Sequence, residues 1–373
     1  MKSVTVFVPL LLMTAALAGC LDSDADSEDA ANRAANPIRR VVEPVSQAAS
    51  GAASVLFAPI DIIDVDHAGG EPVILVDLKG NIIISSHPGY THVRGVDTDL
   101  VTASTGQVFI WRSEDGGETW DFIAAPVGTD TGPRNAATSV SDPDMTMTPG
   151  GRIILTSLQA LASIPVEISD DNGKTWSGQP LHGPPGVDRN WVAACNDQDV
   201  YQVYTSFGHT PLTLLPTGTF GTGSRWFAHS TDGGDTWIDQ HATNAPGNII
   251  CDQVTEGGKY LYAGSGATLA VSEDKGRTFT RADASGIGDI RGGSSMARPA
   301  VDAAGNVYTV GLNNGTTPNA TLYYTVSQDH GKTFSRYVEI PTQGIINGSH
   351  VWPWIVAQDE GHLGIVLYGA SSY

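Results

Sequence analysis

The sequence predicts an all-β fold, a six-bladed β-propeller whose last blade is incomplete at the C-terminus. Five copies of one eight-residue motif, S-x-D-x-G-x-T-[WF], begin at Ser113, Ser169, Ser230, Ser272 and Ser327. Their starts are 56, 61, 42 and 55 residues apart, which is about the length of a four-stranded blade. Paired apolar runs joined by a short turn open six units, which start at Pro72, Asp142, Asn190, Asn248, Arg298 and Trp352.

Each motif copy contains the residue types of a tight hairpin turn. A central Asp lies two residues before a Gly, so the carboxylate can accept backbone N–H bonds within the turn while the Gly adopts a positive φ. The Ser and Thr hydroxyls can join the two strands, and the terminal Trp or Phe fills the space beside the turn. We therefore expect a structural role for the motif aspartates, which are Asp115, Asp171, Asp232, Asp274 and Asp329.

The motif resembles the Asp box, or bacterial neuraminidase repeat, of sialidases and related β-propellers, and the resemblance covers residues 56–373. It implies a sialidase-like propeller. Asp boxes occur in six-bladed sialidases, in xyloglucan-cleaving enzymes, in sorting receptors and in assembly factors without enzymatic activity. The resemblance therefore implies a fold and leaves the function open.

The N-terminus has the composition of an export signal. Lys2 precedes an apolar run, and residues 17–20, Leu-Ala-Gly-Cys, resemble a lipoprotein signal box in which Cys20 is lipidated. The alternative is an ordinary signal peptide cut near Ala18. Residues 21–55 are rich in Ala, Ser and acidic residues and are predicted to be a flexible tether. The propeller, residues 56–373, is then exported and lipid-anchored to the membrane, at the cell surface or the outer membrane.

Net charge is −20 with a pI of about 4.6, which argues against nucleic acid or an anionic membrane surface as a partner. A general acidic excess is also common in proteins from salty habitats. The expected partner is an extracellular glycan or glycoprotein, the expected state is a monomer, and no cofactor or metal is expected. His87 and His92 are close in sequence, but no third ligand stands at a defined spacing from them.

Two cysteines remain after Cys20, namely Cys195 and Cys251. Export permits a disulfide between them, but the alignment of the innermost strands places Cys195 near the end of one strand and Cys251 near the start of the next. Two separate buried thiols are therefore expected, with the disulfide as the alternative. The sixth blade opening runs directly into Tyr373, so its sheet requires residues beyond this position or a strand from residues 56–65.

The innermost strand of a blade begins at the face opposite the Asp boxes, where a pocket is expected. The candidate catalytic residues there are Asp142, Asp144 and Asp252, and the candidate substrate-binding residues are Asp188, Arg189, Trp191, Arg298, His350, Trp352, Trp354, and Tyr90 and Arg94 from the loop 87–94. Arg189 and Arg298 are expected to share one cavity. Arginine pairs with carboxylates and indoles stack on sugar rings, which favours an anionic or sugar-like ligand. Alternatively, the arginines pair with nearby aspartates and the tryptophans pack between blades.

A sialidase is expected to carry an Arg-Ile-Pro motif before the first Asp box and a Tyr nucleophile assisted by a Glu, and neither is recognised in this sequence. Arg189 and Arg298 could correspond to two carboxylate-binding arginines, and Asp142 or Asp144 to an acid. A second possibility is hydrolysis of a neutral glycan by Asp142 or Asp144 opposite Asp252. The sequence therefore predicts a surface-anchored, sialidase-like propeller that binds or hydrolyses extracellular glycans, with a non-catalytic binding scaffold as the alternative.

Overall fold

The computed structural model describes residues 5–6, 62–64, 69–88, 108–124, 141–158, 163–179, 182–183, 186–206, 224–255, 257–264, 269–282, 298–312, 321–335, 337–342 and 351–370. Within these ranges every regular element is a β-strand. None of the described segments forms a helix that could cross a membrane.

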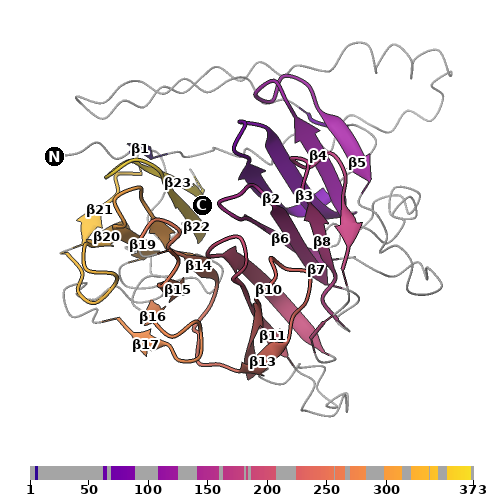
Figure 1. The fold of residues 1–373 in the computed structure, drawn as a ribbon. Helices are drawn as coiled ribbons and strands as arrows, with labels where there is room; N and C mark the ends of the chain where they lie inside the picture. The colour runs from indigo at the N-terminus through magenta and orange to yellow at the C-terminus, as the bar shows by residue number, and fades with distance from the viewer. Residues whose placement is uncertain are drawn as a thin grey trace, which may run out of the picture.

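The strands form six sheets that follow one another around a common centre in chain order (Figure 1), and we number them blades 1 to 6. Blade 1 contains β2 (Gly69–Val76), β3 (Ile82–Pro88), β4 (Phe109–Ser113) and β5 (Asp121–Ala124). Blade 2 contains β6 (Ser141–Met147), β7 (Ile153–Leu158), β8 (Val166–Ser169) and β9 (Ser177–Gly178). Blade 3 contains β10 (Val187–Ala194), β11 (Val200–Ser206), β12 (Ser224–Ser230) and β13 (Asp239–Ala242).

Blade 4 contains β14 (Ile249–Cys251), β15 (Leu261–Ala263), β16 (Ala270–Ser272) and β17 (Thr280–Arg281). Blade 5 contains β18 (Ala300–Val301), β19 (Val307–Leu312), β20 (Leu322–Ser327) and β21 (Val338–Glu339). Blade 6 contains β22 (Val351–Ala357) and β23 (Leu363–Tyr368), with β1 (Thr5–Val6) parallel to β23. Blades 1 to 5 are four-stranded antiparallel meanders, so the predicted all-β propeller architecture is confirmed.

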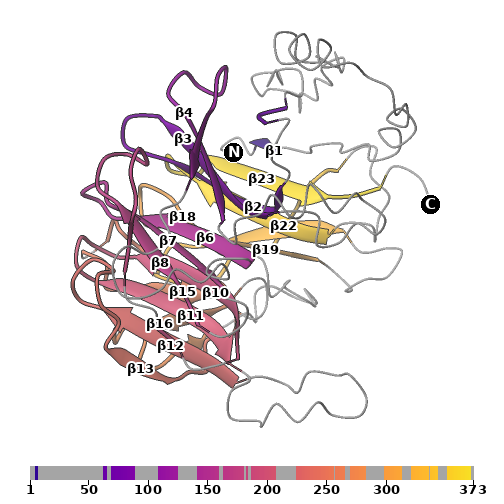
Figure 2. The same ribbon diagram turned by 90° about the vertical axis from the view of Figure 1, so that its right-hand side faces the viewer.

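One backbone hydrogen bond recurs at the end of the innermost strand in all six blades and defines a common register. The donor and acceptor residues are Asp77 and Asn81, Thr148 and Arg152, Cys195 and Asp199, Asp252 and Tyr260, Asp302 and Asn306, and Gln358 and His362, at 2.9 to 3.2 Å. We call this bond the strand-end bond. In the side view, β6, β10 and β22 lie across the molecule (Figure 2). Equivalent residues of different blades can therefore be compared directly.

The blades pack against one another through apolar clusters, except at one place. The residue three positions before the strand-end bond donor is at most 3 % exposed at Met145, Val192, Ile249 and Ile355. The equivalent Ile74 of blade 1 is 61 % exposed, and Val356 on blade 6 is 52 % exposed. In the described residues, blades 1 and 6 are thus not packed together as the other neighbours are.

Only residues 62–64 of the proposed closing strand 56–65 are described. Asp64 accepts a 2.8 Å hydrogen bond from the indole N–H of Trp111 on β4, and residues 62–64 are not in a strand. This part of the segment therefore lies against blade 1. The rest of the proposed strand lies outside the described residues.

The Asp boxes form the predicted turn in all five copies. Taking blade 3 as the example, Ser230 Oγ donates to Asp232 at 2.7 Å, and the N–H of Gly234 donates to Ser230 Oγ at 2.9 Å. The Thr236 N–H and hydroxyl donate to the two oxygens of the same carboxylate at 2.8 and 2.5 Å. The same bonds recur in the other four boxes. The box aspartates are saturated by their own turns, as their structural role requires.

The fourth residue of a box also connects its blade to the preceding one. Arg112 Nε of blade 1 donates to the carbonyl of Asn172 in the blade 2 box at 2.6 Å. Lys275 Nζ of the blade 4 box lies 3.2 Å from the Asp199 carboxylate of blade 3. In the blade 5 box, the ring of His330 stacks on Tyr260 of blade 4 at 4.1 Å. The boxes therefore join neighbouring blades as well as closing hairpins.

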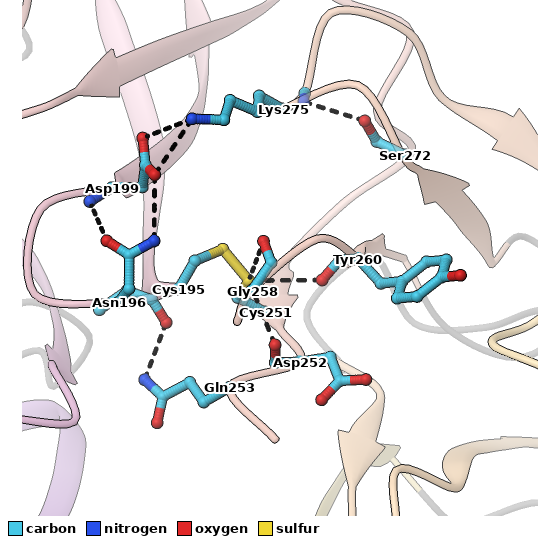
Figure 3. Close-up of a disulfide and its surroundings, with 12 residues drawn as sticks. Cys195, Asn196, Asp199, Cys251, Asp252, Gln253, Gly258, Tyr260, Ser272 and Lys275 are labelled. Atoms are coloured by element: carbon cyan, nitrogen blue, oxygen red, sulfur yellow. Dashed lines mark hydrogen bonds and ion pairs between the residues drawn. A yellow bond between two sulfur atoms is a disulfide. The ribbon is translucent and has the colours of Figure 1, made fainter. Parts of the chain in front are cut away.

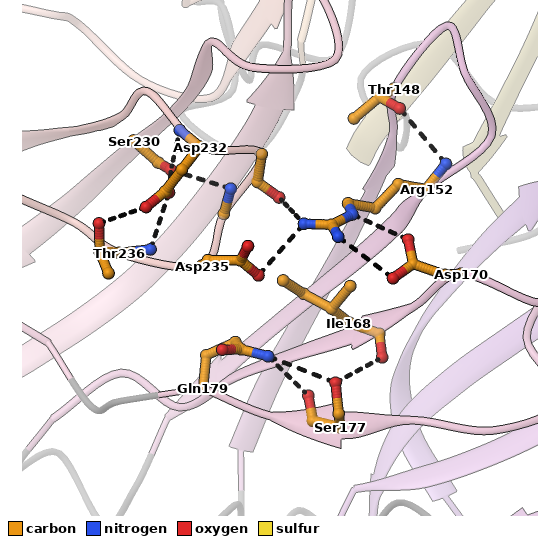
Figure 4. Close-up of polar contacts among 12 residues, drawn as sticks. Thr148, Arg152, Ile168, Asp170, Ser177, Gln179, Ser230, Asp232, Asp235 and Thr236 are labelled. Carbon is orange, nitrogen blue, oxygen red and sulfur yellow. Dashed lines mark hydrogen bonds and ion pairs between the residues drawn. The ribbon is translucent and has the colours of Figure 1, made fainter.

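Between blades 2 and 3 this connection is made by one arginine. Arg152 of blade 2 lies 2.8 Å from Asp170, the second residue of the blade 2 box, and 3.1 Å from Asp235 of the blade 3 box (Figure 4). Its Nη1 also donates to the carbonyl of Gly233 at 3.4 Å. One guanidinium thus bridges two consecutive Asp boxes on what we call the Asp-box face.

The expectation of two separate thiols is wrong, because Cys195 and Cys251 form a disulfide with Cα atoms 5.1 Å apart (Figure 3). The strand β14 contains only three residues and ends at Cys251. Cys251 therefore lies at the end of its strand, as Cys195 follows the end of β10. Because both cysteines lie at the strand-end turns of adjacent blades, the bond joins blades 3 and 4 near the Asp-box face.

Candidate functional site at the strand starts

Four innermost strands carry a β-bulge at the same place near their start. The pairing shifts by one residue between Gly70 and Val73, Ser141 and Asp144, Asp188 and Trp191, and Val351 and Trp354. The inserted residue has a positive φ in three blades, namely 49° at Glu71, 46° at Asp142 and 53° at Arg189. A positive φ is unfavourable for a residue with a side chain, and such strain concentrates at functional sites. We call the end of the ring that carries these bulges the bulge face.

The bulges bring a carboxyl pair together at the adjacent rims of blades 2 and 3. Burial raises the pKa of Asp188, and the charge of Asp142 and a hydrogen bond between the two side chains add to this effect. Arg189 opposes the shift in the pKa of Asp188, and its Nε lies 3.7 Å from the Asp188 carboxylate. Both burial and the charge of Asp142 thus favour the protonated form of Asp188.

A second arginine, which the sequence analysis did not identify, completes this cluster. Arg225, near the start of β12, is in register with Thr205 and, through it, with Asp188. Its guanidinium carbon lies 5.2 Å from the ring centre of Trp191. Burial lowers the pKa of Arg225, and the charge of Arg189 lowers it further. Its Nη1 is buried and makes no hydrogen bond.

The residues four positions before the strand-end bond donor occupy one level of the six innermost strands, which we call the channel layer. Its members are Val73, Asp144, Trp191, Asn248, Arg298 and Trp354. The structure thus brings four of the sequence candidates to the same level. The guanidinium carbon of Arg298 lies 4.5 Å from the ring centre of Trp354. Below this level, a cavity of about 210 Å³ is lined by Arg298 and by Thr146, Ala194, Cys251 and Ala357, among others.

Asp144 is the perturbed carboxyl group of the channel layer. It is 4 % exposed, and one oxygen accepts the N–H of Val192 from the next blade at 2.9 Å. Burial raises the pKa of Asp144 to about 6, although the charge of Arg298 and the hydrogen bond from Val192 oppose the shift. A carboxyl group with such a pKa can hold or release a proton close to neutrality. Asp144 is therefore the described carboxyl group of this layer best suited to proton transfer.

Asn248 is the equivalent residue of blade 4 and was also missed by the sequence analysis. It is fully buried, and neither its oxygen nor its nitrogen has a hydrogen-bond partner. The position equivalent to Val192 in the next blade is Pro299, which has no N–H to donate. The hydrogen bond that Asp144 accepts from the next blade therefore has no counterpart at Asn248.

The structure separates some of the predicted candidates. Arg298 lines the channel cavity and Arg189 is not among its lining residues, so the two arginines do not share this cavity. The reason is the register, because Arg189 is the bulge residue two positions nearer the rim, where it faces Asp188.

Asp252 does not lie with Asp142 and Asp144. It donates the strand-end bond of blade 4, so it lies in the turn at the Asp-box end, and its Oδ1 accepts the N–H groups of Val254 and Thr255 at 2.9 and 2.8 Å. Asp77 and Asp302 occupy the same position in other blades. The proposed pairing of Asp252 with Asp142 or Asp144 is therefore not supported by their positions.

The remaining candidates are only partly described. Trp352 occupies the position in β22 equivalent to Glu71, Asp142 and Arg189. Tyr90, Arg94, His92 and His350 lie outside the described residues. Among the residues that are described, no group of three or more His, Cys, Asp or Glu side chains could hold a metal ion.

Comparison with known proteins identifies the repeat. The family model of the BNR/Asp-box repeat matches residues 167–177, so the chain carries this repeat. No curated protein matches the chain. Similar solved structures include an α-L-arabinanase from Penicillium chrysogenum, at 14% sequence identity and a TM-score of 0.40, which covers 76% of this chain and 70% of its own.

Two further structures are similar at comparable levels. A polysaccharide lyase, an ulvan lyase, has 15% identity and a TM-score of 0.44, with 77% of this chain and 72% of its own covered. A protein of unknown function from Dyadobacter fermentans has 13% identity and a TM-score of 0.41, with 81% and 73% covered.

Proposed function

We propose that this protein is an exported, lipid-anchored propeller that binds extracellular glycans at its bulge face. The observation that carries the proposal is the set of bulges at Glu71, Asp142 and Arg189, which hold polar side chains in an unfavourable backbone conformation at the start of three consecutive innermost strands. A scaffold alone does not need this strain, because the Asp boxes already close the blades. The strained residues are therefore assigned to ligand binding.

The side chains at this face suit a sugar. Carboxylates accept hydrogen bonds from hydroxyl groups, and guanidinium groups donate to them. Trp191 and Trp354, both in the channel layer, add large apolar rings beside Arg225 and Arg298 respectively. A concave site with apolar rings and a few placed polar groups is the usual form of a small-molecule site.

Binding is tested with a glycan array followed by calorimetry on the glycans that bind. Arg189→Ala and Asp142→Ala should each weaken binding about tenfold or more, because each removes a charged hydrogen-bonding group. The matched control is Arg277→Ala, which removes an exposed arginine from the blade 4 Asp box. Wild-type affinity in both bulge-face variants, or equal loss in the control, would refute the placement of the site.

A second candidate function is hydrolysis of the bound glycan, as in an exo-α-sialidase or another glycosidase. The observation in its favour is Asp144, whose pKa of about 6 suits a general acid. Asp142 and Asp188 do not suit the two-carboxylate mechanism, since they are hydrogen-bonded to each other and that mechanism separates its carboxyl groups by at least about 5 Å. Turnover of a fluorogenic sialoside or neutral glycoside that is lost in Asp144→Asn would support hydrolysis. Binding without turnover in the wild type would refute hydrolysis and support glycan binding alone.

The anchor part of the proposal rests on the sequence Leu-Ala-Gly-Cys at residues 17–20. Labelling cells with an alkyne fatty acid should modify the wild-type protein and not Cys20→Ser. Release of unlabelled wild-type protein into the medium would instead indicate an ordinary signal peptide.

A further inference from the structure

We propose that Arg225 and Arg189 form a subsite for one monovalent oxyanion carried by the sugar, either a carboxylate or a sulfate monoester. The proposal rests on the proposed glycan-binding function and names the class of ligand at the same face. It is carried by the surroundings of Arg225, a residue on the third strand of its blade that the sequence patterns did not single out.

The surroundings of Arg225 favour the binding of an anion. It is half-buried, its guanidinium lies over Trp191, and the charge of another cation, Arg189, lowers its pKa. Among the described residues, no carboxylate forms an ion pair with Arg225, and its buried Nη1 makes no hydrogen bond. A buried donor without an acceptor is unfavourable, and an oxyanion that bridges two guanidinium groups would supply acceptors to both.

The neighbouring charges limit the charge of the ligand. The cluster contains Arg189 and Arg225 on one side and the hydrogen-bonded pair Asp142 and Asp188 on the other. With Asp188 protonated the cluster has a net charge of +1, and with both carboxyl groups ionised it is neutral. A single negative charge therefore balances the cluster, whereas a phosphate dianion would leave an uncompensated charge beside Asp188.

The raised pKa of Asp188 also makes the subsite sensitive to pH. When Asp188 loses its proton as the pH rises, a negative charge is added beside the arginines and an anion binds less tightly. The other charged groups at this end are Glu71 on blade 1 and Asp144 with Arg298 in the channel. Asp142→Asn removes the neighbouring charge that raises the pKa of Asp188, so it should move this part of the pH dependence to lower pH.

The test measures binding to the whole chain in detergent by calorimetry at constant ionic strength. The probes are D-glucuronate and D-galactose 6-sulfate, with D-glucose and D-galactose as neutral counterparts, and methyl sulfate as a free monovalent anion. Wild-type protein should bind at least one acidic probe about tenfold or more tightly than its neutral counterpart. The relative affinities of the two acidic probes identify the carboxylate or the sulfate ester as the source of the anion.

Arg225→Gln should weaken binding of the acidic probe about ten- to a hundredfold and leave the neutral sugars unchanged. Arg281→Gln, which removes an exposed arginine from the outer strand β17, is the matched control. Arg225→Lys keeps the charge without the planar fork and should bind at an intermediate level, and thermal unfolding of each variant separates lost binding from lost folding. In Asp142→Asn, affinity should vary less between pH 5 and 8 than in the wild type.

The outcomes separate this inference from the function on which it rests. If acidic and neutral sugars bind equally and Arg225→Gln changes neither, the oxyanion subsite is refuted while glycan binding stands. If methyl sulfate binds through Arg225 and no saccharide binds, the subsite stands and the glycan function is refuted. If no probe binds, both are refuted.

Discussion

Both faces of the ring contain non-glycine residues with a positive φ, but these residues have different roles at the two faces. On the Asp-box face the non-glycine residues with positive φ are Asn172, Lys275 and His330, each the fourth residue of a box. On the bulge face they are Glu71, Asp142 and Arg189. At the Asp-box face the strained residues lie in saturated turns and connect blades. At the bulge face they gather charged groups that the fold does not need.

The carboxyl groups of the two faces also differ, because their pKa values are shifted in opposite directions. Hydrogen bonds from the Thr119 hydroxyl, the Thr119 N–H and Ser113 lower the pKa of Asp115 to about 2 on the Asp-box face. Burial raises the pKa of Asp144 to about 6 at the bulge end of the channel. We infer that a carboxylate whose hydrogen bonds are all made within its own turn has a structural role. A carboxyl group whose pKa is raised by burial is instead a candidate for chemistry.

The largest expected effect concerns the disulfide near the Asp-box face. Replacing both Cys195 and Cys251 by Ala should lower the free energy of unfolding by about 4 kcal/mol, since the bond closes a loop across 56 residues. Urea unfolding of the double variant and the wild type measures the change. If this face is the scaffold, glycan binding of the folded variant should be unchanged. Loss of binding without loss of folding would break the division between the faces.

The next largest effect tests how closely the Asp-box face is packed. Gly276 and Gly116 both belong to boxes and have φ of 80° and 79°. A Cβ at Gly276 would overlap the ring of Phe227, whereas one at Gly116 would meet nothing within 4 Å. Gly276→Ala should therefore cost about 3 kcal/mol and Gly116→Ala about 1 kcal/mol. Equal costs, measured by thermal unfolding, would show that the backbone conformation alone limits this face.

The third prediction is a gain in stability and concerns Asp144. Because its pKa in the folded state is raised above the unfolded value of 3.8, the wild-type protein loses stability as the pH rises through about 6. Asp144→Asn lacks this charge, so it should match the wild type near pH 4 and exceed it by about 2–3 kcal/mol at pH 8. Unfolding curves at the two pH values test this. A variant less stable than the wild type at pH 8 would mean that the fold requires the Asp144 charge.

The fold was largely predictable because its signal is local. Each Asp box is closed by bonds among residues such as Ser230, Asp232 and Thr236, which lie within one eight-residue turn. The blade openings were recognised for the same reason. Cys251 was misplaced because the strand-end bond after β14 joins residues eight positions apart, Asp252 and Tyr260, whereas in the other five blades it joins residues four positions apart.

The site was less predictable because its contacts are distant in sequence. Asp144 and Arg298 were found as charged residues at strand starts, a pattern visible in one blade at a time. Arg225 was missed because its significance depends on Trp191 and Arg189, which belong to a strand two positions away in the sheet. A stronger signal was available for the bulges, since Pro72, Pro143 and Pro353 recur at the same position and proline within a strand favours a bulge.

The smallest expected effect completes the contrast with Asp144. The bonds from Thr333 and Ser327 lower the pKa of Asp329 to about 2 against the opposing effect of burial. Its charge therefore stabilises the fold above the unfolded pKa of 3.8, and this contribution is lost as the pH falls through about 2. Because the group is largely exposed, Asp329→Asn should cost only about 1 kcal/mol at neutral pH, a difference that shrinks towards pH 2 in unfolding experiments. A gain in stability at neutral pH, as expected for Asp144→Asn, would mean that the carboxyl groups of the two faces do not differ in kind.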